Sequence, residues 1–112
     1  MIALTPDGLD ALLAEPRVLL FKHSPRCGVS RWAHEAMEEV ELLLPSVPVA
    51  IVDVVHARAL SHELAARTGV AHQSPQLLLL ERGRVAWHIS HGAITSEAVR
   101  RRLEGAPDRV GS

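Results

Sequence analysis

The chain has 112 residues, a length that favours one folded domain. Hydrophobic residues make up 47% and charged residues 22% of the sequence, a balance that excludes an intrinsically disordered chain. The formal net charge is −1 and aromatic residues contribute 3%, so the composition disfavours nucleic acid and anionic membrane surfaces as partners.

The sequence predicts neither a membrane span nor a signal peptide. Its apolar runs, such as residues 77–80, are far shorter than the about 20 residues that cross a bilayer. The N-terminus lacks the basic region and the small-residue cleavage site of a secretory signal. Because Cys27 is the one cysteine, no internal disulfide can form, and we expect a cytoplasmic protein.

A helix and a strand are predicted first. Thr5 is the expected N-cap of the helix, Pro6 occupies its first position, and Pro16 ends it. The continuous apolar run 18–21 predicts a strand that is buried on both faces. The expected buried residues of the helix are Leu9, Leu12 and Leu13.

The strongest helical pattern follows the turn-rich segment 23–28. Apolar residues recur there at the spacing of one helix face, which predicts a buried stripe that includes Trp32. The stripe consists of Val29, Trp32, Ala33, Ala36, Met37, Val40, Leu43 and Leu44. Four glutamates fall on the opposite, solvated face: Glu35, Glu38, Glu39 and Glu41. Pro45 and Pro48 close the helix.

A second interior strand and another helix follow. Residues 49–52 form a continuous apolar run, and Asp53 at its end is either a buried proton acceptor or a helix cap. The helix extends from about residue 57 to residue 68, where Gly69 supplies its stop. Its inward residues are Leu60, Leu64 and Ala65.

The last third of the chain predicts a hairpin and a helix. The apolar runs 77–80 and 85–89 flank a turn at 81–84. Thr95 caps the helix, and Ile94 and Val99 have the spacing of a hydrophobic staple. Three arginines, Arg100, Arg101 and Arg102, lie near the negative end of this helix on a surface expected to be solvated.

The predicted order of elements is α-β-α-β-α-β-β-α. Two strands joined by a crossover helix form a parallel pair, and the hairpin adds antiparallel strands. The expected fold is α/β with a mixed four-stranded sheet flanked by helices, which is the layout of thioredoxin-like proteins. We expect residues 1–104 to form one domain and residues 105–112 to form a disordered C-terminal tail.

Cys27 lies between a strand and a long helix, where unpaired backbone N–H groups and the helix dipole favour a thiolate. Arg26 and His23 add positive charge nearby. The alternative is an inert core cysteine, but the turn residues Pro25 and Gly28 are poor neighbours for a core side chain. An accessible nucleophilic thiolate is therefore the prediction.

Residues 27–30 have the spacing of a thioredoxin C-x-x-C motif, with Ser30 in place of the second cysteine. A C-x-x-S site cannot form an internal disulfide, so another thiol must resolve its mixed disulfide. Ser30 either donates a hydrogen bond to the thiolate or is an ordinary first-turn residue. Pro75 precedes the hairpin, where thioredoxin-like proteins carry a cis-proline that faces the reactive cysteine.

Three segments carry a family resemblance, which extends from about residue 3 to residue 104. Residues 21–30 (FKHSPRCGVS), 70–76 (VAHQSPQ) and 90–95 (SHGAIT) resemble the signature blocks of the YtxJ-like monothiol bacilliredoxins. The His-x-Ser-Pro-Gln sequence in the second block is the most distinctive. The chain departs from the family where Cys-Gly-Val-Ser replaces the commoner Cys-Pro-Ile-Ser and where Gly92 replaces a large residue.

The resemblance implies a thiol–disulfide oxidoreductase that removes bacillithiol from S-bacillithiolated client proteins. Cys27 would attack the mixed disulfide and retain bacillithiol, which a second bacillithiol or another redoxin would remove. Bacillithiol is then a co-substrate, and no cofactor is bound. The catalytic residues on this interpretation are Cys27 and Ser30, and the substrate-binding residues are His23, Arg26, Gly28, His72, Ser74, Pro75 and His91.

Two other functions remain open. Cys-Gly-Val-Ser is also similar to the Cys-Gly-Phe-Ser of monothiol glutaredoxins, which use glutathione and hold an iron–sulfur cluster, although Ser74-Pro75-Gln76 does not match their Thr-Val-Pro. A redox-inactive interaction or stress domain of the same fold is the other alternative. The seven histidines include no pair at the spacing of His-Glu-x-x-His, so we expect no metal site.

Overall fold

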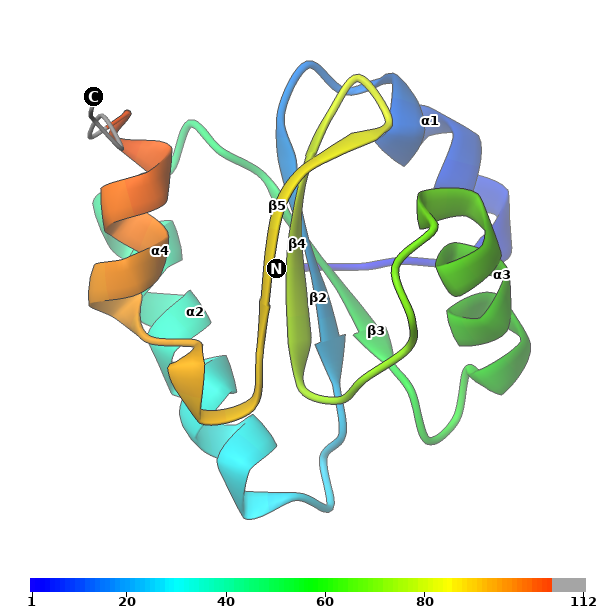
Figure 1. The fold of residues 1–112 in the computed structure, drawn as a ribbon, viewed down its shortest axis with the longest axis horizontal. Coiled ribbons are helices and arrows are strands. Elements are labelled where there is room, and N and C mark those ends of the chain that lie inside the picture. The colour runs from blue at the N-terminus through cyan, green and yellow to red at the C-terminus, as the bar shows by residue number, and fades with distance from the viewer. Residues whose placement is uncertain (106–112) are drawn as a thin grey trace.

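A mixed five-stranded sheet with helices on both faces forms the fold, which the computed structural model describes for residues 1–105 (Figure 1). The strands lie in the order β1-β3-β2-β4-β5, in which β1, β3 and β2 are parallel and β4 and β5 are antiparallel to their neighbours. Their bounds are β1 Ile2–Ala3, β2 Val18–His23, β3 Val49–Asp53, β4 Gln76–Glu81 and β5 Arg84–Ser90.

The helices divide between the two faces of the sheet (Figure 1). Helices α2 and α4 cover one face, and α1 and α3 cover the other. Two 3₁₀ turns, η1 (Pro6–Gly8) and η2 (His91–Ala93), precede α1 and α4. The helices are α1 Leu9–Ala14, α2 Gly28–Leu43, α3 Arg58–Thr68 and α4 Ser96–Leu103.

The core forms two apolar layers because side chains alternate along each strand. On β2, Leu19 and Phe21 pack toward α2 and α4, whereas Val18 and Leu20 pack toward α1 and α3. All four side chains are buried, as the continuous apolar run predicts. The thioredoxin-like α/β prediction is confirmed in its element types and in the antiparallel hairpin.

The prediction of four strands is wrong, because β1 adds a fifth at the sheet edge. Ile2 and Ala3 pair in parallel with Ala50 and Ile51 of β3. The strand has two residues and both side chains are exposed, so it leaves neither alternation nor a buried run in the sequence. The observed order is β-α-β-α-β-α-β-β-α.

The first helix begins later than predicted. Pro6 to Gly8 form the 3₁₀ turn η1, and Thr5 precedes it without a capping hydrogen bond from its side chain. The α-helix itself starts at Leu9 and ends at Ala14, before Pro16. Leu9 and Leu12 are buried as expected, while Leu13 is partly buried against the same core layer.

The buried stripe of α2 is narrower than predicted. Its buried residues are Ser30, Ala33, Met37 and Val40, a row at three- and four-residue spacing. Trp32 is not a core residue, because 73% of its surface is exposed. The apolar pattern alone cannot show where the sheet and α4 stop covering the helix. Glu35, Glu38 and Glu39 are solvated as predicted, but Glu41 is half-buried and pairs with the N-terminal amine.

The second half of the chain follows the predicted signals closely. The hairpin turns at Arg82 and Gly83, which both have positive φ (52° and 80°). Gly69 ends α3 in the left-handed conformation with φ 74°. Thr95 caps α4 by accepting a hydrogen bond from the Ala98 amide at 3.1 Å. Residues 106–112 of the predicted tail lie outside the described residues.

Lys22 is a charged residue inside the sheet, an unusual position for an ammonium group. It is 0% exposed on β2, and among residues 1–105 its Nζ has no hydrogen-bond partner. Its antiparallel neighbour Gln76 is also buried and donates from Nε2 to the Ala71 carbonyl at 3.1 Å. Burial lowers the pKa of Lys22, because the charged form loses its hydration.

Replacing Lys22 by methionine should therefore stabilise the fold. We expect the Lys22→Met variant to gain about 1–3 kcal/mol in the free energy of unfolding at pH 7, measured with urea. The folded-state pKa of Lys22 lies below the unfolded value, so the cost of its burial declines as the pH rises toward 10.5. The gain should accordingly be smaller at pH 10 than at pH 7. The exposed Arg31→Met serves as control. A Lys22→Met variant that is no more stable than Arg31→Met would contradict this explanation.

Candidate active site

Cys27 stands at the junction between β2 and α2. It is the N-cap residue of α2, with extended backbone angles (φ −106°, ψ 126°) and no capping hydrogen bond from its side chain. Its amide donates to the Ser24 carbonyl at 3.1 Å, and its own carbonyl accepts from the Arg31 amide at 3.1 Å. The backbone of Cys27 is thus held in a turn, while its thiol is partly exposed. Cys27 is free, as the predicted nucleophile requires.

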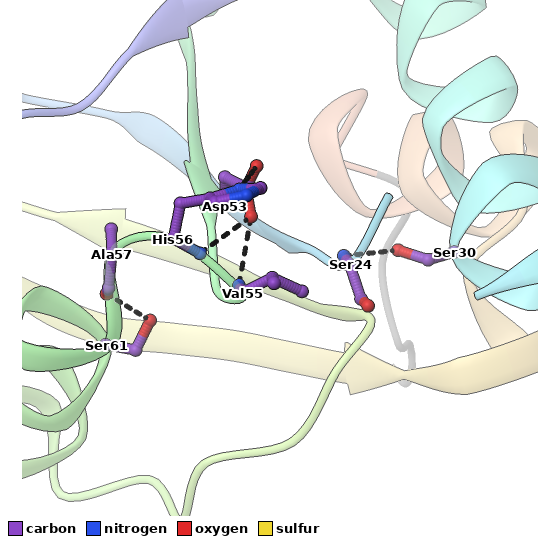
Figure 2. Close-up of polar contacts among 7 residues, drawn as sticks. All are labelled: Ser24, Ser30, Asp53, Val55, His56, Ala57 and Ser61. Carbon is purple, nitrogen blue, oxygen red and sulfur yellow. Dashed lines mark hydrogen bonds and ion pairs between the residues drawn. The ribbon is translucent and has the colours of Figure 1, made fainter. Parts of the chain in front are cut away.

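Ser30 ties this turn to the end of β2. The side chain is 0% exposed, and its Oγ accepts a hydrogen bond from the Ser24 amide at 2.9 Å (Figure 2). The same Oγ lies 2.8 Å from Nδ1 of His23. A hydroxyl donates one hydrogen bond and accepts two, so Ser30 can bind the Ser24 amide and the His23 ring at the same time, with the direction of the second bond set by the His23 tautomer.

The surroundings of His23 favour its neutral form. The ring packs beside Phe21 and His34, with ring centroids 5.4 and 4.9 Å from its own. Its pKa lies below the ordinary value of 6.5, mainly because of desolvation and then because of the His34 charge, with Asp53 and Ser30 opposing the shift. At neutral pH His23 is therefore uncharged, so the expectation that it adds positive charge near Cys27 is wrong.

The loop before β4 meets the segment before α4. The peptide bond between Ser74 and Pro75 is cis. The Pro75 carbonyl accepts a hydrogen bond from the His91 amide at 2.9 Å, so two segments distant in the sequence are joined. His91 itself adopts a positive φ of 56° at the start of η2. The structure thus brings together the second and third sequence blocks.

The other predicted binding residues differ in their surroundings. Arg26 and Gly28 flank Cys27 and are exposed. Ser74 is half-buried, and its Oγ has no hydrogen-bond partner among residues 1–105. His72 is exposed, and its pKa is lowered by desolvation and by the charges of Lys22 and His62, which places His72 near the buried lysine. No contact between His72 and Cys27 supports the expected convergence.

Asp53 plays neither of the roles considered for it. Its side chain is 40% exposed, so it is not a buried proton acceptor. Its Oδ1 accepts from the amides of Val55 and His56 at 2.9 and 3.2 Å, and Oδ2 lies 2.8 Å from His56 Nδ1 (Figure 2). The hydrogen bond with the His56 side chain is the main cause of a lowered pKa at Asp53. Asp53 therefore closes the turn after β3, whereas the N-cap of α3 is Ala57.

Two features of the described chain bear on metals and membranes. Within residues 1–105, no cluster of three or more His, Cys, Asp or Glu side chains is arranged to hold a metal ion. None of the helices described is long and apolar enough to cross a membrane.

Comparison with known families shows which family this chain belongs to. The family model of the monothiol bacilliredoxin BrxC matches residues 5–99. The chain belongs to this family. The matched region includes Cys27 and Ser30, and also Pro75 and His91, which a hydrogen bond joins. The family is described as monothiol, and this chain has one cysteine.

Solved structures show the same fold. A protein described as a candidate oxidoreductase with a thioredoxin fold has a TM-score of 0.84 and 25% identity, with 91% of this chain and 92% of that chain covered. Thioredoxin from Trypanosoma brucei brucei has a TM-score of 0.77 and 16% identity over 97% and 92% of the two chains. Thioredoxin f2 from Chlamydomonas reinhardtii has a TM-score of 0.74 and 13% identity over 96% and 98%. Family and fold together support a thiol–disulfide oxidoreductase.

The Ser30 contacts generate a stability prediction. Ser30→Ala removes the partner of the buried Ser24 amide and of His23 Nδ1, so we expect a loss of about 1–3 kcal/mol in the free energy of unfolding. Urea denaturation measures this loss, and the exposed Ser46→Ala is the matched control. If Ser30→Ala were as stable as Ser46→Ala, the hydrogen bonds of Ser30 to Ser24 and His23 would not contribute to the stability of the fold.

Proposed function

We propose that the protein removes bacillithiol from S-bacillithiolated proteins by means of Cys27. The observation that carries the proposal is the pairing of a partly exposed Cys27 with a fully buried Ser30 at the position of the second cysteine of a C-x-x-C motif. Ser30 is occupied by Ser24 and His23, and Cys27 is the one cysteine of the chain. The mixed disulfide on Cys27 therefore has to be resolved by a thiol from outside the chain.

The reaction proceeds as two thiol–disulfide exchanges. The Cys27 thiolate attacks the bacillithiol sulfur of the client's mixed disulfide, so one S–S bond forms as another breaks and the client leaves as a thiolate that takes a proton from water. A second bacillithiol thiolate then attacks this sulfur, which releases Cys27 as a thiolate and bacillithiol as its disulfide. One bacillithiol thiol is thus consumed, it forms a disulfide with the bacillithiol taken from the client, and the client is released as a thiol.

The residues around Cys27 have defined parts in this proposal. The first-turn amides of α2 stabilise negative charge on the sulfur, and the exposed Arg26 offers a cation to the carboxylates of bacillithiol. The Ser74–Pro75 loop and His91 form the other wall of the substrate site, joined by the hydrogen bond between them. This chemistry requires a reducing compartment, and we propose the cytoplasm.

A turnover assay with a bacillithiolated protein tests the proposal. The reduced enzyme and bacillithiol are mixed with the client without oxygen, and the released client thiol is measured over time. We expect Cys27→Ser to release no more thiol than bacillithiol alone, while Ser30→Ala, at a temperature where it is folded, retains most of the activity. The nucleophile must be part of the reacting bond, whereas Ser30 acts on the turn.

The same assay identifies the carrier thiol. A glutathionylated client with glutathione should be turned over much more slowly than the bacillithiolated client with bacillithiol. Faster turnover with glutathione would show that glutathione is the carrier thiol and would favour a glutaredoxin-like protein. Full activity in Cys27→Ser would refute the mechanism, and inactivity of the wild type with both clients would leave a redox-inactive domain of this fold.

A further inference from the structure

A groove of about 340 Å³ begins at Val29, in the first turn of α2, and runs between α2 and the segment that leads into α4. Its apolar floor includes Val29 and Trp32 of α2, with Ile94 from the opposite wall. His91, which is joined to the Ser74–Pro75 loop, also lines it. The groove therefore adjoins the candidate active site at two points: Val29, which follows Cys27 by two residues, and His91, which is bonded to Pro75.

Trp32 is the outstanding feature of the groove. The exposed fraction of its side chain is 73%, and that of Val29 is 37%, although both belong to the apolar pattern of α2. Exposed tryptophan next to a reactive group is typical of protein-binding surfaces, where this residue type is enriched among those that dominate affinity. Leu42 and Leu43 are also exposed but lie at the other end of α2 and do not line the groove.

The charges of the groove are acidic. Glu35 and Glu39 line it one helical turn apart, and neither forms an ion pair within residues 1–105. Glu38 and Glu41, which do form ion pairs, lie outside the groove, and no arginine or lysine lines it. Such a surface repels carboxylates and attracts cations, so its occupant differs from the carboxylate-bearing bacillithiol.

We propose that this groove docks the polypeptide of the client protein, by taking an apolar side chain against Trp32 and a lysine or arginine beside Glu35 and Glu39. The proposal rests on the proposed function, since it assigns the protein half of the mixed disulfide to this groove and the bacillithiol half to the opposite side of Cys27. Along α2, Glu39 lies about 18 Å from Cys27 at 1.5 Å per residue, a distance that about five or six extended client residues span.

Kinetics with two peptides test the docking surface. Each peptide carries one bacillithiolated cysteine and the same leucines, flanked by lysines in the basic peptide and by glutamates in the acidic peptide. We expect Trp32→Ala to lower kcat/KM for the basic peptide about tenfold and to leave unchanged the rate at which Cys27 of the reduced protein forms its mixed disulfide with bacillithiol disulfide. The double variant Glu35→Lys/Glu39→Lys should reverse the preference for the basic peptide. Leu42→Ala and Glu38→Lys are matched controls on the same helix.

Distinct outcomes separate the docking proposal from the proposed function. Unchanged kinetics in both groove variants would refute docking. If Trp32→Ala slowed the reaction of Cys27 with bacillithiol disulfide as much as it slowed peptide turnover, the groove would belong to the small thiol instead. If the wild type reduced neither peptide and formed no adduct with bacillithiol disulfide, the proposed function would fail. Docking would still be tested by titrating the basic peptide, with serine for cysteine, while recording the indole N–H resonance of Trp32. A shift supports the groove, and no shift at millimolar peptide refutes it.

Discussion

The hydroxyl group of Ser30 connects the end of the central strand to the start of the long helix, and the position of Cys27 depends on this connection. The Ser30 hydroxyl accepts a hydrogen bond from the Ser24 amide and is also hydrogen-bonded to His23, so one buried group connects three points around the turn. The turn leaves the sulfur partly exposed while its backbone is held at both sides. The serine at this position thus holds the turn in place, and it also leaves the motif without a second cysteine.

The two faces of the sheet serve the site differently. The α2 and α4 side carries the well-packed layer that seats the reactive turn and, at its edge, the exposed Trp32. The other side holds the buried Lys22 beneath the loop that ends at Pro75, where Gln76 bonds back to the Ala71 carbonyl. Polar groups without partners cluster in this second region, at Lys22 Nζ, Ser74 Oγ and Gln76 Oε1, as far as residues 1–105 show. Such groups are costly inside a protein and concentrate where function constrains the chain.

Local signals in the sequence predict most of the fold, and the remainder depends on which surfaces are buried by distant elements. The continuous apolar runs at 18–21 and 77–80 predict strands buried on both faces, and helices cover both faces in the structure. Gly69 ends α3 through its left-handed backbone, and Thr95 caps α4 with its side chain. Trp32 matches the apolar period of α2, but the width of the covered stripe depends on how far α4 reaches. The two-residue β1 is defined only by its pairing with β3, which the sequence does not show. The hydrogen bond between Ser30 and His23 joins two different elements, α2 and β2, and it too depends on the fold. The position of Cys27 at the N-cap was predictable, since strand, turn and helix signals meet there.

The account rests on Cys27 as a thiol that carries bacillithiol as a mixed disulfide, and intact mass spectrometry measures this most directly. The reduced protein is exposed at neutral pH to bacillithiol disulfide or to glutathione disulfide, and samples are quenched with acid over time. The account predicts one bacillithiol adduct per chain, located on Cys27 by peptide mapping, which forms much faster than the glutathione adduct. Absence of an adduct from either disulfide would contradict the account and show that Cys27 is inert in this fold.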